Sequence, residues 1–289
     1  MHCAADAVTG AAEARELASV ARERIGLKLD FSTPKIEALL RAMPADGRRA
    51  FCRDLIRSEP DAPAWRAFCE ALLVHETYFF RHPDQLRLLG DVLLPRLLQD
   101  RLDAGSAELR IWCAGCSSGE EVYTLALLLQ TAIAGSALPL AQAWNATVLG
   151  TDLSANTLEL ARVGSYALVA GLNSFRDVPA FARHHFASIF STAQGAWSAN
   201  AELRRLTRFA RHNLVREPPA LRDVDLVVCR NTLIYFDEAQ TCAALASLEA
   251  ALRPEGALLL GPAETAAEGG RLDMVCTEQA VFWRKRAAR

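Results

Sequence analysis

From Ala14 to Arg81, apolar side chains recur at three- and four-residue spacing, which is the period of an amphipathic helix. Glycine and proline interrupt this pattern, so it predicts several short helices instead of one long helix. The predicted breaks fall at Gly26, Pro34, Pro44, Gly47 and Pro60 to Pro63. The sequence therefore predicts a small N-terminal bundle of about four helices. Another helical pattern, Gln85–Arg101, follows Pro83.

Beyond Arg101, apolar runs of strand length alternate with longer helical patterns. This alternation predicts a mostly parallel sheet covered by helices, which is an α/β fold. The predicted strands are Leu109–Cys113, Ala146–Thr151, Leu206–Ala210, Val224–Cys229 and Ala257–Gly261, with a late pair around Met274–Lys285. The predicted helices are Glu120–Ala134, Ser154–Val163, Asp237–Leu252 and a short one near Ala220. Residues 164–205 do not follow the alternation, which indicates an inserted subdomain.

The composition narrows the class of protein. At 289 residues and 51% apolar content, the chain has room for one large domain and a small one. Its net charge of −2 argues against a general nucleic-acid binder, which would normally be basic. No apolar run reaches signal-peptide length or the ~18–20 residues of a membrane span, so we expect no membrane insertion and a cytoplasmic location. The scattered cysteines fit buried thiols in a reducing compartment.

The most informative segment is Arg110–Glu121, where an apolar strand leads into small residues and then an acidic pair that opens a helix. Such a loop brings backbone N–H groups and a helix N-terminus close to a bound ligand. The next predicted strand ends on Asp152, where a doubly wound sheet hydrogen-bonds a ribose diol. The loop lacks the GxGxxG and P-loop fingerprints of phosphate binding, so the pattern indicates a nucleoside without phosphates. S-adenosylmethionine (SAM) is such a ligand.

Polar residues also follow two other predicted strands. Arg230, Asn231 and Tyr235 come after Val224–Cys229, and Asn213 follows Leu206–Ala210. Ligands of open α/β sheets bind outside the carboxyl ends of the strands, so these residues are candidates for the site. Asn213 is in position to read an adenine amino group. For Asn231, a helix cap is the alternative role.

Two further motifs have competing interpretations. Thr77–Arg81 is an aromatic cluster that ends in a guanidinium. Either Arg81 clamps a carboxylate through its planar fork, or the cluster anchors a core and the arginine is solvated. Cys113 and Cys116 resemble a thioredoxin-like C-x-x-C pair. Metal binding would need a second pair of ligands, and the sequence has no partner C-x-x-C or H-x-x-x-H motif. A turn of this kind also needs small residues for steric reasons alone, so redox chemistry is not favoured.

Four blocks agree in order and content with one family: TYFFR, CAGCSSGEEVYTLAL, GTDLSANTLELARVGSY and DLVVCRNTLIYFD. From about Phe31 to its end, the sequence resembles the CheR-type chemotaxis receptor (protein-glutamate) O-methyltransferases. The resemblance implies a Rossmann-like class I SAM-dependent methyltransferase domain at residues 83–289. This domain would carry an inserted small antiparallel β-subdomain at residues 164–205 and follow an all-α N-terminal domain at residues 1–82.

The resemblance also implies the reaction and its partners. A methyl group would pass from SAM to glutamate side chains of chemoreceptors, which gives methyl esters and S-adenosylhomocysteine. The implied partners are cytoplasmic receptor helices with methylatable glutamates, and a receptor tail peptide at the inserted subdomain. Arg81 and Tyr235 would lie nearest the transferring methyl as catalytic residues. The implied cofactor contacts are His75, Thr77, Arg81, Glu120, Asp152, Asn213, Leu214, Arg230 and Asn231.

Some positions depart from the family's pattern. His75 stands where an asparagine is usual, Val122 replaces a common proline, and Gly261–Thr265 replaces a G-H-S-E pattern. The N-terminal helices are also less basic than expected for gripping an acidic receptor helix. A second hypothesis is therefore a catalytically altered relative that acts as a SAM-binding signalling or scaffold module.

Two other classes share the expected fold skeleton. An NAD(P)-dependent oxidoreductase is disfavoured by the missing GxGxxG. The other is a methyltransferase for nucleic acid or a small molecule. Enzymes that methylate adenine or cytosine nitrogens commonly show a D/N-P-P-Y/F tetrapeptide, and none occurs in this sequence.

Overall fold

The computed structural model describes residues 2–135, 144–167, 174–176, 179–181, 196–266, 270–278 and 280–287, with side chains from residue 11 onward. The chain divides into two compact units. The first comprises Met1–Val74 and Leu233–Ala244, and the second comprises His75–Thr232 and Leu245–Arg289. Within the described residues, we find no helix with the length and apolar character that a membrane span requires.

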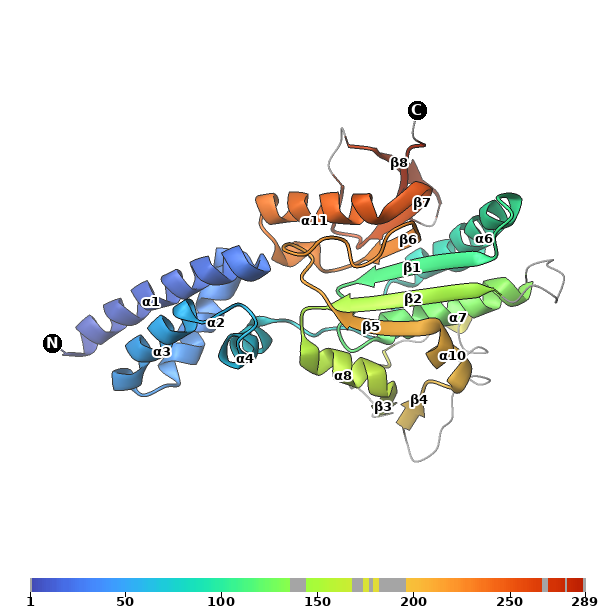
Figure 1. Cartoon of the computed structure of the whole chain (residues 1–289). Coiled ribbons are helices and arrows are strands. Elements are labelled where there is room, and N and C mark those ends of the chain that lie inside the picture. Colours follow the sequence, from blue (N-terminus) through green and yellow to red (C-terminus); the bar gives the residue numbers. More distant parts are fainter. Residues whose placement is uncertain are drawn as a thin grey trace. The chain divides into compact units, whose positions relative to one another are not determined.

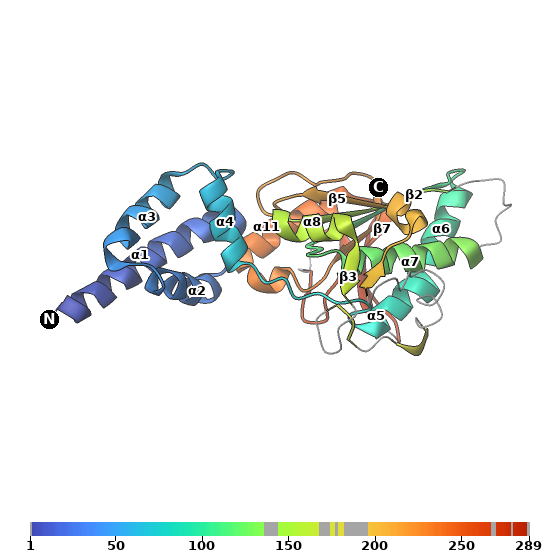
Figure 2. The same cartoon turned by 90° about the horizontal axis from the view of Figure 1, so that it is seen from below.

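The first unit gathers four N-terminal helices, as Figures 1 and 2 show for the described residues: α1 (His2–Ile25), α2 (Leu29–Arg41), α3 (Ala45–Arg57) and α4 (Pro63–Leu72). Leu17, Ile36 and Leu72 form part of its interior and are fully buried. The predicted helical character of this region is confirmed.

Two of the predicted helix breaks are wrong. Pro34 lies inside α2 and Gly47 lies inside α3. A proline within a helix costs about 3 kcal/mol. In α2, burial of the flanking Ile36 and Leu40 offsets this cost, since each such side chain contributes roughly 1.5–3 kcal/mol. Gly47 has open space around it and costs the helix only about 1 kcal/mol.

The segment Leu233–Ala244 belongs to the first unit by its contacts. It contains a 3₁₀ turn, η3 (Leu233–Tyr235), and the start of α11 (Glu238–Ala251). The Lys28 N–H donates to the Tyr235 carbonyl at 2.9 Å. The Phe31 ring packs 5.0 Å from the Tyr235 ring, centroid to centroid. Arg22 and Asp237 form an ion pair.

The second unit is built on a sheet with the strand order β5-β2-β1-β6-β7-β9-β8. The first five of these strands are parallel, while β9 runs antiparallel to β7 and β8. Figure 1 shows the arrowheads of β1, β2 and β5 at one edge. The strands are β1 (Glu108–Ala114), β2 (Asn145–Asp152), β5 (Thr207–Arg211), β6 (Val224–Cys229), β7 (Leu252–Leu260), β8 (Leu272–Cys276) and β9 (Val281–Lys285). The predicted mostly parallel α/β sheet is confirmed, and its chain order reverses beside β1, where such sheets bind ligands.

Helices cover this sheet. They are α5 (Pro83–Arg87), the π-helical turn η1 (Leu88–Leu93), α6 (Leu94–Asp103), α7 (Glu120–Gly135), α8 (Ala155–Val163), α10 (Ala201–Leu206) and the end of α11. Figure 2 shows α6 beside α7. The short helix predicted near Ala220 is wrong, because Pro218 and Pro219 remove two backbone donors from that stretch. Instead α10 forms earlier, where the Asn200 side chain caps its start.

The described part of the predicted insert is a two-stranded antiparallel sheet of β3 (Ser165–Ala167) and β4 (Ala196–Ser198). Tyr166 pairs with Trp197 across it, and both rings are buried. The Phe79 ring packs against both, at 5.0 Å and 4.6 Å between centroids. The rest of the predicted insert falls mostly on residues 168–195, and most of these lie outside the described part of the chain.

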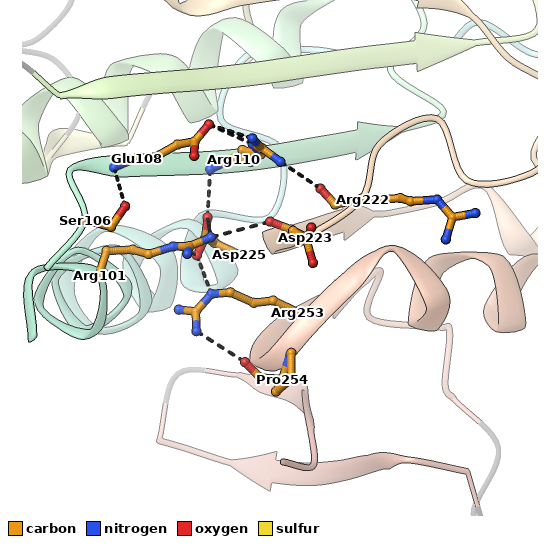
Figure 3. Close-up of polar contacts among 9 residues, drawn as sticks. All are labelled: Arg101, Ser106, Glu108, Arg110, Arg222, Asp223, Asp225, Arg253 and Pro254. Atoms are coloured by element: carbon orange, nitrogen blue, oxygen red, sulfur yellow. Dashed lines mark hydrogen bonds and ion pairs between the residues drawn. The ribbon is translucent and has the colours of Figure 1, made fainter. Parts of the chain in front are cut away.

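At the amino-terminal edge of the seven-stranded sheet, the carboxylate of Asp225 on β6 is fully buried, with 0% exposure. Arg101 Nε donates to its Oδ1 at 2.6 Å, and the Arg110 backbone N–H donates to its Oδ2 at 2.8 Å. Arg253 forms a second ion pair with the same carboxylate (Figure 3). One acidic side chain on β6 therefore joins α6, β1 and β7.

Candidate functional site

The loop between β1 and α7 is a tight turn against the end of β2. The N–H groups of Gly115 and Cys116 both donate to the Thr151 carbonyl, at 2.8 Å and 2.9 Å. Gly115 has a φ of +79°, and a Cβ added there would lie only 2.1 Å from Thr232 Oγ1. Glycine is therefore required at this position, because the loop after β1 touches the loop after β6.

The predicted ribose ligand, Asp152, lies at the end of β2, and backbone donors hold its carboxylate. Oδ2 accepts the Ser117 N–H at 2.8 Å, and Oδ1 accepts the Ser154 N–H at 2.9 Å. Ser154 in turn caps α8, since its Oγ accepts the Thr157 N–H at 3.1 Å. Asp152 thus connects the loop after β1 with the start of α8.

The two acidic residues that open α7 point to different partners. Glu120 is 2% exposed, and its carboxylate accepts hydrogen bonds from Ser118 Oγ and Ser174 Oγ, both at 2.7 Å. Burial raises the pKa of Glu120 above its usual range, and the two hydroxyl donors only partly offset this. Glu121 forms a buried ion pair with Arg230.

The structure gives Arg230 several partners within the protein. Besides the pair with Glu121, Nη1 donates to the Arg81 carbonyl at 2.8 Å and to Gln85 Oε1 at 3.1 Å. The Arg230 side chain is 3% exposed, and Gln85 itself donates to the Leu260 carbonyl at 2.7 Å. Arg230 therefore holds α7, α5 and the preceding segment in place, and a contact between its side chain and a cofactor stays a prediction.

Asn231 has a left-handed backbone, with φ at +57°. Its Oδ1 lies 3.1 Å from Nε2 of His82, and its N–H donates to Glu264. Burial lowers the pKa of His82, and the positive charge of Arg230 adds to this effect, so the ring favours its neutral form. The sequence reasoning missed His82. In the sequence, the only indication of a role for His82 is its position between Arg81 and Pro83.

The segment before α5 holds three other predicted site residues. Arg81 Nη1 donates to the Glu76 carbonyl at 2.9 Å, and its guanidinium lies 5.6 Å from the Tyr78 ring centroid. Arg81 Nε is buried and makes no hydrogen bond among the described residues. Thr77 is buried, whereas His75 is exposed.

After β5, Asn213 closes a turn, because its Oδ1 accepts the N–H groups of Val215 at 3.2 Å and Arg216 at 3.3 Å. The adjacent Leu214 is buried. His212, which precedes them, donates its N–H to the Asp152 carbonyl at 3.0 Å. This turn therefore lies beside the end of β2.

These contacts join most of the predicted cofactor residues at the carboxyl edge of one sheet, within the second unit. The catalytic candidate Tyr235 belongs to the first unit, where it contacts Phe31 and Lys28. In the described ranges, no group of three or more acidic, histidine or cysteine side chains is arranged to hold a metal ion.

The polar atoms at this edge fit a polar ligand such as SAM. Ser117 Oγ and Arg81 Nε are buried without a hydrogen-bond partner among the described residues. Buried polar groups in native proteins nearly always make a hydrogen bond. These two atoms therefore suit a bound ligand that supplies their hydrogen-bond partners. Asp152 ends β2, and a ribose contact at its carboxylate stays a prediction.

Cys113 and Cys116 are unsuited to thiol chemistry. Both side chains are fully buried, and burial raises the pKa of each thiol well above its usual range. The negative charges of Glu121 and Asp152 act in the same direction on Cys113 and Cys116 respectively. Because the thiolate is the reactive form, this environment suppresses redox reactivity.

We expect Glu120→Gln to stabilise the ligand-free protein at pH 8. The folded-state pKa of Glu120 lies above the unfolded value, so folding opposes its ionisation. The cost in stability therefore grows as the pH rises from the unfolded pKa, near ~4.3, to the folded pKa, and it is complete above the folded pKa. Thermal unfolding should show a higher Tm for the variant at pH 8 and a difference that shrinks towards pH 4. An unchanged or lower Tm at pH 8 would contradict this account.

Comparison with known proteins gives the family context. The family described as CheR methyltransferase, SAM binding domain matches residues 75–281. A Borreliella burgdorferi chemotaxis protein methyltransferase is 30% identical over 68% of this chain and 66% of its own length. The probable biofilm formation methyltransferase WspC of Pseudomonas aeruginosa is 37% identical over 69% of this chain and 44% of its own length. An uncharacterized 104.1 kDa protein of Rhodobacter capsulatus is 36% identical over 67% of this chain.

This chain spans only part of these relatives, from 19% of the Rhodobacter capsulatus protein to 66% of the Borreliella burgdorferi enzyme. The matched region includes β1 through β8 and the segment from His75 onward. It therefore covers the whole carboxyl edge described above.

Proposed function

Because the chain belongs to the CheR methyltransferase family, we propose that it transfers a methyl group from SAM to glutamate carboxylates of chemoreceptor proteins. The products would be glutamyl methyl esters and S-adenosylhomocysteine. In this proposal the partners are cytoplasmic receptor helices that carry methylatable glutamates, with a receptor tail peptide at the inserted subdomain. The place of action would be the cytoplasm.

The observation that carries the proposal is the position of Asp152 within the family match. Its carboxylate is fixed at the end of β2, beside the loop after β1. Asp152 would hold the ribose hydroxyls, and Asn213 and Leu214 after β5 would contact the adenine. Glu120 and Thr77 would add polar contacts. Arg81 Nε makes no hydrogen bond among the described residues, which supports a bond to the methionine carboxylate.

The residues around the site suit an acceptor that is already a nucleophile. Bound SAM supplies a methyl group activated by a sulfonium centre. The acceptor glutamate has a pKa near ~4.3 in water and is ionised at neutral pH, so the protein needs no general base. The absence of a need for a general base agrees with the two catalytic candidates, Arg81 and Tyr235, since neither is a typical base. The protein's task is to orient the carboxylate and exclude water from it.

The two catalytic candidates would divide this task. Methylation removes the negative charge of the acceptor, so a strong arginine–acceptor pair would stabilise the substrate more than the transition state. We therefore assign Arg81 to the carboxylate of the cofactor. Tyr235 would orient the acceptor through its hydroxyl group.

The decisive assay is methyl transfer from radiolabelled SAM to receptor-containing membranes, followed by base treatment. Release of the label as methanol would identify a carboxyl ester. Label that resists base would instead indicate N-methylation. Tight binding of S-adenosylhomocysteine without transfer to any receptor would favour the alternative of a signalling or scaffold module.

We expect Tyr235→Phe and Arg81→Ala to fail in different ways. The first should lower kcat by roughly 100-fold, the effect of a ~1 Å misplacement, with nearly unchanged affinity for S-adenosylhomocysteine. The second should weaken that affinity by roughly 10- to 100-fold, since hydrogen bonds to charged groups contribute ~1.5–3 kcal/mol. Calorimetry and initial rates would separate the two effects. Arg96→Ala, an exposed arginine on α6, is the matched control, and the reverse pattern would refute these roles.

A further inference from the structure

One buried carboxylate has no place in the cofactor contacts proposed above. Glu264 lies in the turn after β7 and is 9% exposed. Its Oε2 accepts the N–H groups of Gly261 at 2.8 Å and Asn231 at 2.9 Å, and its Oε1 accepts the Thr232 N–H at 2.8 Å. These are charge-assisted hydrogen bonds to backbone donors, which are about twice as strong as neutral ones.

The turn after β7 is shaped to present this carboxylate. The Glu264 N–H donates to the Gly261 carbonyl at 3.0 Å. A Cβ at Gly261 would lie 2.7 Å from Glu264 Oε2 and 2.9 Å from the Asn231 nitrogen, so only glycine fits. The intervening Pro262 and Ala263 are exposed. The departures from the family's G-H-S-E pattern thus fall on the exposed positions, and the two retained residues make the contacts.

Glu264 accepts hydrogen bonds from the loop after β6, and this loop contains Asn231. The left-handed φ of +57° at Asn231 is sparsely populated by residues other than glycine, and such a backbone persists only when its surroundings impose it. The loop after β6 also contacts the segment before α5 and the loop after β1. Asn231 Oδ1 contacts His82 Nε2 at 3.1 Å, and Thr232 lies against Gly115.

We infer that Glu264 is a positioning residue, whose carboxylate sets the backbone of Asn231 and Thr232 and thereby shapes the cofactor site. The inference depends on the proposed function only for the identity of the ligand. Since both carboxylate oxygens accept backbone N–H groups, a side chain with a single acceptor oxygen cannot replace it. Glu264→Gln would direct an amide N–H₂ at one of these donors.

The experiment combines ligand binding with amide exchange on the whole 289-residue chain. In Glu264→Gln, we expect the affinity for S-adenosylhomocysteine to fall roughly 10- to 100-fold, as expected for loss of hydrogen bonds to a charged group. Hydrogen–deuterium exchange should accelerate at the amides of Asn231 and Thr232 and stay unchanged within β6. Glu278→Gln removes the same charge at an exposed site and should match the wild type in both measurements.

The possible outcomes separate this inference from the proposed function. Wild-type exchange at Asn231 and Thr232 together with wild-type affinity in Glu264→Gln would overturn the inference. Faster exchange throughout the sheet would also overturn it, because it would indicate a general structural role. Glu264→Asp, which keeps both oxygens on a shorter chain, should give an intermediate affinity if Glu264→Gln does not fold. A wild-type protein that binds S-adenosylhomocysteine but methylates no receptor would refute only the proposed function.

Discussion

Arg230→Ala is expected to lower the free energy of unfolding by about 3–5 kcal/mol, because it leaves a buried carboxylate without its cation. The side chains of Arg230 and Glu121 are only 3% and 10% exposed. The substitution also removes the donor to the Arg81 carbonyl and to Gln85. Urea unfolding followed by circular dichroism would measure the change.

The surface pair of Arg162 and Glu159 provides the control for this prediction. Its side chains are 42% and 72% exposed, so Arg162→Ala should change the unfolding free energy by only about 0–1 kcal/mol. Replacing both buried partners, as in Glu121→Leu with Arg230→Met, should recover much of the loss, because no unpaired charge remains. A loss below about 1 kcal/mol in Arg230→Ala would show that the pair is not important for stability.

Asp152→Ala should weaken binding of S-adenosylhomocysteine by at least about 100-fold, which is roughly 2.7 kcal/mol. The substitution would remove the proposed ribose acceptor. It would also release the N–H groups of Ser117 and Ser154, so the loop after β1 and the start of α8 would lose their common anchor. Isothermal titration calorimetry would measure the affinity.

Two comparisons sharpen the test at Asp152. Asp152→Asn keeps one acceptor oxygen and should bind more tightly than the alanine variant. Asp103→Ala, at the exposed end of α6, should bind as the wild type does. Binding within a few-fold of the wild type in Asp152→Ala would remove the main support for a nucleoside at this edge.

The features that could be predicted from the sequence are those that depend on the order of apolar and polar residues within one short segment. The strand Val224–Cys229 is apolar at every position except Asp225, and the structure has it at the same bounds. The end of β2 at Asp152 could also be predicted locally, because the strand pattern Ala146–Thr151 stops there. The strand β7 begins at Leu252, earlier than the predicted start at Ala257. The sequence hides this start because Arg253, Pro254 and Glu255 interrupt the apolar pattern.

The parts that were not predictable depend on partners far apart in the chain. Glu121 and Arg230 are separated by 109 positions, and His82 and Asn231 by 149. Residue spacing carries no signal for such pairs, since only the folded sheet brings them together. In the sequence, Glu264 stands out only as a residue that the altered G-H-S-E motif retains. Its contacts are with backbone N–H groups, which any sequence would supply, so the residue types around it carry no signal.

The buried Asp225 has a consequence for how this domain would evolve. It gathers two guanidinium groups and a strand amide at the margin of the sheet remote from the candidate cofactor site. The ion pairs of Asp225 therefore support thermal stability from the margin opposite the candidate cofactor site. A substitution at Asp225 would leave the candidate cofactor residues in place, so we expect a temperature-sensitive protein with unchanged specificity.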